Sequence, residues 1–174
     1  WELHHPIDRM EVLYDAIVDA GRSHDMVEFG TYAMGVMRLE KGYKAWGSEL
    51  TTEITPVEAD IMRFVDLSKE FKGKAATVAR QGEDLPMVCV YAELDAGDAD
   101  CRGNEPTLDA GRVMGITTAG TWAHSVGKSV FFAYVEPKFA APGSSFDVRV
   151  MNDIRQATVL ADPVWDPKNE RIRA

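Results

Sequence analysis

The sequence has little cysteine, no long apolar run and fewer basic than acidic residues, and each scarcity excludes a class of protein. Its two cysteines, Cys89 and Cys101, form no Cys-x-x-Cys pair, which disfavours a metal or redox motif of that kind. Two unpaired thiols indicate a reducing compartment. No apolar run approaches the roughly 18 residues of a membrane span. The 19 basic and 28 acidic residues give a net charge of −9. We therefore expect neither a nucleic-acid nor a membrane partner.

The length and composition are those of a globular protein. A chain of 174 residues suits one large domain or two small ones, and 45% hydrophobic with 27% charged residues is an ordinary balance. The sequence begins at Trp1, and the following Glu2-Leu3-His4-His5-Pro6 matches neither a signal nor a transit peptide. We expect it to enter a longer protein part-way.

The first half is predicted to be helical. Asp8-Arg9-Met10-Glu11 has the spacing of a capping box, and apolar residues recur at helical spacing from Met10 to Val18 before Gly21 ends the run. Further helices are expected from Thr31 to Gly42 with Tyr32, Val36 and Met37 buried, from Thr55 with Pro56 at its first position, and around 74–80.

Strands are predicted in the second half, beyond a seam at about residues 81–86. β-Branched and aromatic runs mark strands at 88–94, 113–118, 130–135, 146–151 and 157–160. Asn152-Asp153 is expected to form the turn between the last two, and 95–112 a long polar loop. Short strands without intervening helices favour a small antiparallel barrel or sandwich.

The sequence lacks the common catalytic motifs. It has no Gly-x-Ser-x-Gly elbow, no phosphate-binding glycine loop and no His-Glu-x-x-His helix. His4 and His5 are adjacent on an extended segment, so their side chains should face opposite ways, which disfavours joint metal binding. No metal site is predicted.

Two segments, 32–50 and 55–59, nevertheless resemble a known family in sequence. Taken alone, their apolar residues are core and their charges belong to helices. Together they resemble the folate-dependent aminomethyltransferase family, the glycine-cleavage T-protein and its relatives, and most of all the C-terminal region of dimethylglycine and sarcosine dehydrogenases. Later motifs match in order and spacing: Ile116-Thr117-Thr118-Ala119-Gly120-Thr121-Trp122, Gly127-Lys128-Ser129 and Ala133-Tyr134-Val135.

The resemblance implies an α+β fold in two parts. Residues 1–83 would be the C-terminal part of a ferredoxin-like folate-binding domain, and residues 84–174 a small antiparallel β-barrel. It also implies tetrahydrofolate as cofactor, and an upstream domain or second chain that completes the pocket and supplies the catalytic aspartate and the FAD domain. No catalytic residue is assigned to this chain. The implied location is the cytoplasm or, in a eukaryote, the mitochondrial matrix.

By resemblance, Glu2 is the carboxylate that binds the pterin. Taken alone, a carboxylate so near the first residue is most simply a solvated charge. The chemistry fits the assignment, because a pterin edge presents two parallel N–H donors and a carboxylate offers two acceptors in one plane. His4 follows Glu2 on the same face of an extended segment and would border the ligand.

Two positions depart from the family pattern. Arg63 stands where relatives tend to carry an aromatic residue near the pterin, and is either a guanidinium that stacks on the flat ring or an ordinary helix-end charge. Met34 stands where T-proteins have a functional arginine, so that role is not carried over.

The resemblance implies one-carbon transfer from N-methyl groups to tetrahydrofolate, giving 5,10-methylene-tetrahydrofolate. Two alternatives remain open: a non-catalytic folate-binding or scaffold module, and a folate-dependent S- or O-demethylase. The iron–sulfur assembly proteins of the same fold are disfavoured, because the Lys41-Gly42-Tyr43 position lacks their cysteine.

Overall fold

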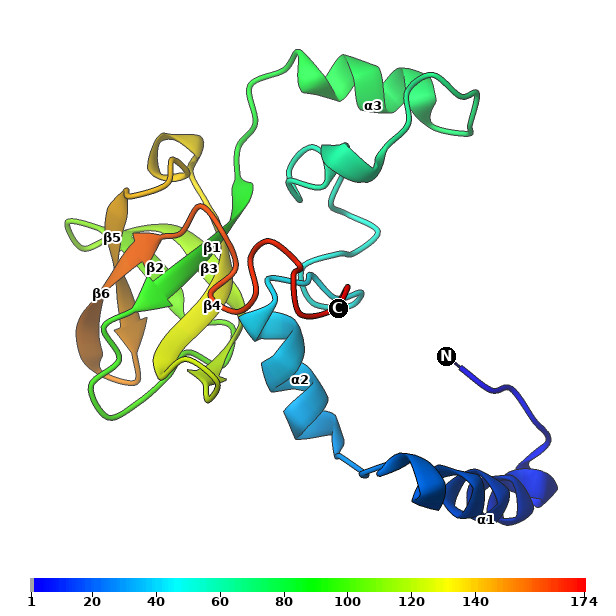
Figure 1. The fold of residues 1–174 in the computed structure, drawn as a ribbon. Coiled ribbons are helices and arrows are strands. Elements are labelled where there is room, and N and C mark those ends of the chain that lie inside the picture. Colours follow the sequence, from blue (N-terminus) through cyan, green and yellow to red (C-terminus); the bar gives the residue numbers. More distant parts are fainter. Residues whose placement is uncertain (1) are drawn as a thin grey trace. The chain divides into compact units, whose positions relative to one another are not determined.

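The computed structural model describes residues 2–174 and divides into two compact units between Met34 and Gly35. The first unit carries α1 (Met10–Gly21), and the second carries α3 (Lys74–Gln81) and the strands (Figure 1). Helix α2 (Thr31–Glu40) crosses the division.

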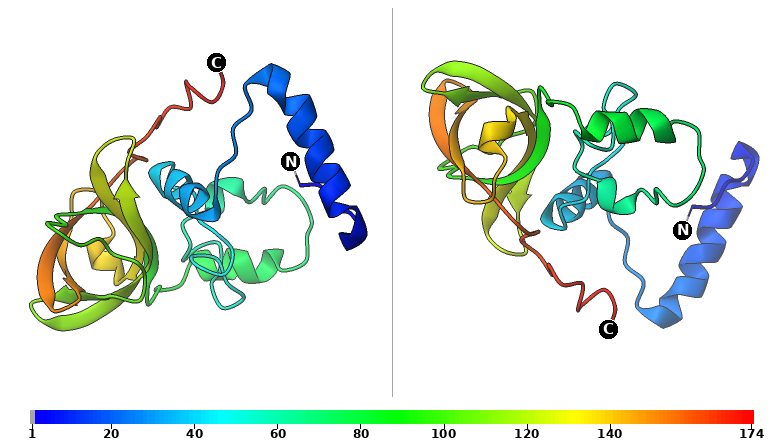
Figure 2. Two further views of the ribbon diagram at one scale, coloured as in Figure 1. Left: turned by 90° about the horizontal axis from the view of Figure 1, so that it is seen from below. Right: turned by 90° about the horizontal axis from the view of Figure 1, so that it is seen from above.

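A closed antiparallel barrel is the core of the second unit. In the described chain its six strands are β1 (Val88–Leu94), β2 (Pro106–Asp109), β3 (Arg112–Ala123), β4 (Lys128–Val135), β5 (Ser145–Val150) and β6 (Asp153–Val159). Around the barrel they follow the order β1-β4-β3-β2-β5-β6, and β6 pairs back onto β1. Figure 2 shows the strands as a closed ring. The predicted α+β class with a C-terminal barrel is confirmed.

Alternate residues of each strand fill the barrel and cover its outside. On β4, Phe131 points inward and meets Phe146 of β5 edge to face, with ring centroids 6.3 Å apart. Its neighbour Phe132 belongs to a second apolar cluster outside the barrel, with Leu39 of α2 and Cys89. This outer cluster is the surface on which the segment after α2 packs. Cys89 is buried there, as predicted.

Two positions in the middle of β3 have room only for glycine. A Cβ at Gly115 would overlap the Tyr134 carbonyl oxygen and lie 2.6 Å from Thr107 Oγ1, and a Cβ at Gly120 would lie 2.5 Å from the Cys101 carbonyl oxygen. The register of β3 against β4 shifts between Thr117 and Ala119. Such a bulge bends a strand and helps a small sheet to close.

The predicted strands all form, with three differences. The 95–112 segment, predicted to be a loop, contains β2, whose four residues pair with both β3 and β5. The β5–β6 turn is one residue earlier than predicted, because Met151 adopts a left-handed φ of 56° and Asp153 pairs with Val150. Strands β3 and β6 extend further than predicted, since β4 and β5 supply backbone hydrogen-bond partners for the added residues.

Helices form at three of the four predicted places. The predicted helix from Thr55 is wrong: one turn forms, with Ala59 N donating to Thr55 O at 3.0 Å, and Asp60 then takes a left-handed φ of 52°. Asp8 does not cap α1, because a 3₁₀ turn (Ile7–Arg9) leads directly into it and Arg9 N already donates to Pro6 O.

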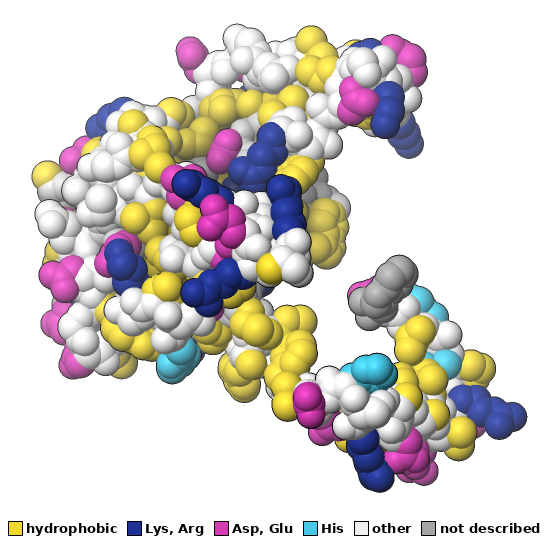
Figure 3. Space-filling model, viewed as in Figure 1, with side chains coloured by type: hydrophobic (Ala, Val, Ile, Leu, Met, Phe, Trp, Pro, Cys, Tyr) yellow, Lys and Arg dark blue, Asp and Glu magenta, His cyan; other side chains and the backbone are white. Residues whose placement is uncertain are grey.

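The predicted burial of the α2 face is also wrong. Tyr32 is 91% exposed and Met37 is 47% exposed, while Val36 is half-buried. Only the last two residues of α2, Leu39 and Glu40, are buried. Hydrophobic side chains are likewise exposed along α1 (Figure 3). Helical periodicity specifies an apolar face, but burial requires a partner surface.

Candidate functional site

The three sequence-predicted site residues are divided between the two units. Glu2 and His4 lie together in the first unit, with His4 Nε2 3.7 Å from Glu2 Oε2 and both side chains more than 90% exposed. Arg63 belongs to the second unit, on a 3₁₀ turn (Met62–Phe64), with its guanidinium 4.7 Å from the ring centroid of Phe64. Residues 2–6 form no strand, since a strand needs a neighbouring edge to pair with.

The second unit contains a cavity that is a candidate binding site, and Arg63 lines it. The cavity has a volume of about 420 Å³, within the usual range for small-molecule pockets. Its walls come from the segment after α2, which gives Lys44 and Arg63, and from the outer face of β1 and β4, which gives Tyr91 and Phe132. The two aromatic rings are tilted against each other, with centroids 5.1 Å apart. The acidic residues of the lining are Asp60 and Asp162.

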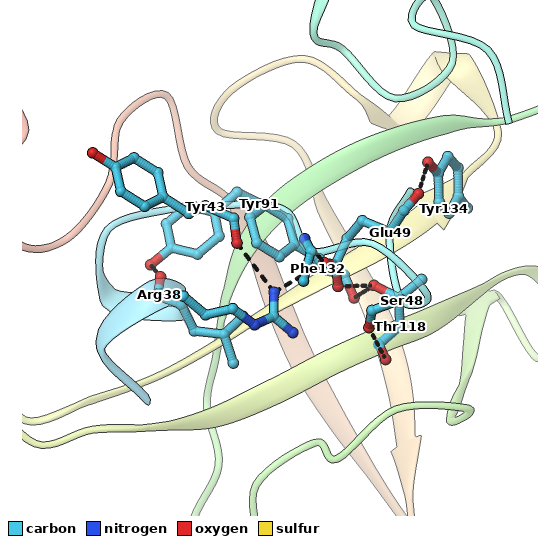
Figure 4. A network of polar contacts seen from close by, with 10 residues as sticks. Arg38, Tyr43, Ser48, Glu49, Tyr91, Thr118, Phe132 and Tyr134 are labelled. Atoms are coloured by element: carbon cyan, nitrogen blue, oxygen red, sulfur yellow. Dashed lines mark hydrogen bonds and ion pairs between the residues drawn. The ribbon is translucent and has the colours of Figure 1, made fainter. Parts of the chain in front are cut away.

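A buried carboxylate holds the Lys44 segment in place. The side chain of Glu49 is fully buried, and it accepts hydrogen bonds from Arg38 Nη1 at 2.9 Å, from Ala45 N at 2.8 Å and from Thr118 Oγ1 at 2.7 Å (Figure 4). These donors come from α2, from the segment itself and from β3. Burying an ionised carboxylate is costly unless charged and polar partners satisfy it, and here three do.

Two tyrosines of the barrel bond the same region through their hydroxyls. Tyr134 donates to the Glu49 carbonyl oxygen at 2.7 Å, and Tyr91 donates to the Leu39 carbonyl oxygen at 2.8 Å. Burial raises the pKa of both phenols. Both hydroxyls are therefore protonated donors at neutral pH, with a structural role.

The end of α2 is attached to distant parts of the chain. Glu40 accepts from the backbone N–H and the hydroxyl of Ser125, each at 2.8 Å. Lys41 is buried and pairs with Asp166 at 3.3 Å, and Trp165 N donates to the Glu40 carbonyl oxygen. The β3–β4 turn and the C-terminal segment thus both hold the helix end that leads to Lys44.

Glu58 attaches α3 to the Thr55 turn. Its buried carboxylate accepts from Arg80 Nε at 2.6 Å and bonds the Thr55 hydroxyl, while its carbonyl oxygen accepts from Cys89 N of β1. Although burial alone would oppose ionisation, the hydrogen bonds from Thr55 and Arg80 hold the pKa of Glu58 below its usual range.

Glu58→Gln is expected to destabilise the protein at neutral pH, by about 2 kcal/mol for lost charged hydrogen bonds. A depressed pKa stabilises the fold above the unfolded value near 4.3, and this contribution disappears as pH falls through the folded pKa. Denaturant unfolding should therefore show a difference from wild type at pH 7 that shrinks below about pH 4. Glu83→Gln, which removes the exposed partner of Arg80, is the control and should change little. A difference that persists undiminished in acid would contradict this account.

The cavity offers binding surfaces and few reactive groups. Burial raises the pKa of the Cys89 thiol to about 12, so at neutral pH it is an unreactive thiol. Sequence reasoning found Arg63 but missed Lys44, Tyr91 and Phe132. Tyr91 and Phe132 alternate with inward residues of β1 and β4, and that alternation was the only available signal that they face outward.

The fold is shared with a protein of known structure. The structure resembles the crystal structure of the glycine cleavage system aminomethyltransferase T from Bartonella henselae with a TM-score of 0.80, at 21% identity, over 93% of this chain and 45% of that one. This chain therefore has the fold of part of that aminomethyltransferase.

Two family models identify the chain further. Residues 1–69 match the GCVT N-terminal domain and residues 87–166 match the glycine cleavage T-protein C-terminal barrel domain. The chain therefore belongs to the glycine cleavage T-protein family, as its sequence predicted.

The curated relatives are considerably longer than this chain. It is 36% identical to mitochondrial dimethylglycine dehydrogenase from Rattus norvegicus over 99% of its own length and 21% of that protein. It is 29% identical to a probable aminomethyltransferase from Thermococcus kodakarensis over 90% of its length and 41% of that protein. The chain thus spans about a fifth to two fifths of these relatives. Over residues 2–174, the structure has no helix long and apolar enough to cross a membrane.

Proposed function

We propose that this chain is the C-terminal part of a tetrahydrofolate-dependent one-carbon transfer protein similar to dimethylglycine dehydrogenase. A methyl group of an N-methylated glycine would first be oxidised, with the flavin of an upstream domain or partner chain as electron acceptor. The oxidised carbon would then be transferred to tetrahydrofolate to give 5,10-methylene-tetrahydrofolate. The observation that carries the proposal is that one cavity is lined by residues of both matched family segments: Arg63 from the first, and Tyr91 and Phe132 from the barrel. We further propose a domain boundary between residues 83 and 84.

The residues present fit a folate chemically. Tetrahydrofolate joins a bicyclic heterocycle, whose pyrimidine ring is planar, to an aromatic ring and an acidic tail. The cavity presents two aromatic side chains, and within the described residues the Arg63 guanidinium has no carboxylate partner. Among residues 2–174, the Glu2 carboxylate pairs with His4 at 3.7 Å and is more than 90% exposed, so it can accept further hydrogen bonds.

Each of these groups has a binding role in the proposal. Glu2 would accept the paired N–H donors of the pterin edge, His4 would border the ring and Arg63 would stack on a ring face. The folate supplies the nitrogens that receive the one-carbon unit. An upstream domain or a partner chain would supply the catalytic acid and the flavin. Such a site accelerates the reaction mainly by positioning and preorganised charge, which requires a complete pocket.

Calorimetric titration with tetrahydrofolate tests the pterin assignment. Glu2→Gln replaces one acceptor oxygen with a donor and removes the charge, so binding should weaken about 10- to 100-fold. Glu11→Gln, an exposed carboxylate on α1 of the same unit, is the matched control and should bind as wild type. Equal affinities of the two variants would overturn the role of Glu2, and no binding by wild type would overturn the folate proposal for this chain.

A further inference from the structure

Lys44 lines the cavity without an anionic partner. Its ammonium lies 5.3 Å from the ring centroid of Phe132, and within residues 2–174 it has no carboxylate within 4.0 Å and no hydrogen bond. The neighbouring cations Arg38 and Lys41 are both paired, with Glu49 and Asp166. Lys44 is half-buried, so its charge is partly desolvated, and in the part of the chain that the structure describes it is offset by the Phe132 ring rather than by a carboxylate.

The position of Lys44 is held on both sides. Ala45 N donates to the buried Glu49 carboxylate, and Arg38 Nη1 donates to the Tyr43 carbonyl oxygen at 3.1 Å. The backbone of Lys44 therefore lies between two fixed residues. A cation on a fixed backbone beside an aromatic wall is a preorganised receptor for an anionic group.

The rest of the cavity lining narrows the class of anion. Asp60 and Asp162 also lie on the cavity, and they would repel a compact polyanion such as phosphate. Lys44 and the rings of Tyr91 and Phe132 together fit a ligand that carries both an aromatic ring and a carboxylate. In the proposed folate, the aminobenzoyl-glutamate portion has this chemistry.

We propose that Lys44 is the carboxylate-binding residue of the cavity and selects folates by their acidic tail. The inference rests on the proposed function and adds the residue that recognises the end of the ligand remote from the pterin. Because Lys44 meets the tail and not the reacting nitrogens, it affects affinity through the ligand's carboxylates alone.

A pair of matched ligands tests the proposal. Wild-type chain should bind tetrahydrofolate about tenfold more tightly than tetrahydrofolate diamide, in which amides replace both glutamate carboxylates. Lys44→Met should weaken tetrahydrofolate about tenfold and the diamide less than twofold. Lys44→Arg keeps the charge and should retain most of the affinity. Lys72→Met, at an exposed lysine outside the cavity, is the control and should change neither titration.

The outcomes separate the two proposals. If wild type binds both ligands equally, or if Lys44→Met weakens both equally, the carboxylate site is wrong while the folate function stands. If wild type binds neither ligand, both proposals fail. The wild-type comparison requires no substitution, so equal binding of the two ligands contradicts carboxylate recognition even if Lys44→Met fails to fold; Lys44→Arg then tests whether the charge at this position is responsible. Far-UV circular dichroism and Tm establish whether each variant is folded.

Discussion

Glu49→Ala is expected to lower the free energy of unfolding by about 3–5 kcal/mol. The substitution removes the fully buried carboxylate that accepts from the Arg38 guanidinium, the Ala45 amide and the Thr118 hydroxyl. Arg38 and Thr118 then keep only carbonyl acceptors, at 3.1 Å and 3.4 Å. Each donor that loses the carboxylate costs its own desolvation, and the guanidinium costs most because it is charged. In a chain of this size, the loss should lower Tm by about 10 °C or more.

The matched control for Glu49 is Glu53→Ala, four residues further along the same segment. The Glu53 side chain is exposed and is part of no ion pair in the described chain, so its removal should change stability by less than about 0.5 kcal/mol. Chemical denaturation of both variants provides the measurement. A Glu49→Ala protein as stable as Glu53→Ala would show that the network contributes nothing to the position of the Lys44 segment.

Gly115→Ala should destabilise the barrel by about 3 kcal/mol, an unusually large effect for one added methyl group. The new Cβ would overlap the Tyr134 carbonyl oxygen and Thr107 Oγ1. Neither neighbour moves freely, since β4 is paired with both β1 and β3, and β2 is paired with both β3 and β5. The strands must separate, and their ladder hydrogen bonds weaken with them.

The control for Gly115 is Gly35→Ala on α2. A Cβ at Gly35 meets nothing within 4 Å, and alanine favours a helix by about 1 kcal/mol over glycine. Thermal unfolding should show a lower Tm for Gly115→Ala and an unchanged or higher Tm for Gly35→Ala. If Gly115→Ala unfolds at the wild-type temperature, the close approach of the strands at this position does not constrain the sequence.

The sequence predicted those strands whose residue types by themselves favour a strand. β1 was predicted with both its ends correct, because an alternating β-branched and aromatic run follows Pro86 and stops at the polar Asp95. β2 was missed, because Pro106-Thr107-Leu108-Asp109 has no such pattern and becomes a strand only between β3 and β5.

The candidate site was only partly accessible from the sequence. Arg63 was singled out by family likeness, and it lines the cavity. Lys44 was not singled out, since the sequence around it does not indicate that this lysine lacks a carboxylate partner. Over residues 2–174, Lys44 lacks a carboxylate partner because the nearby Glu49 bonds other groups. One of these is Thr118, which lies 69 residues further along the chain. The roles of Glu2 and His4 stay predictions.

The sequence by itself determined the family, the α+β class and the places of most helices and strands, because motif order, periodicity and turn residues are local properties. The tertiary structure alone decided which apolar helix faces are buried, how β2 closes the barrel and which charges are paired. Those outcomes depend on contacts between residues far apart in the chain. The residues of a single segment do not determine the free energy of such contacts.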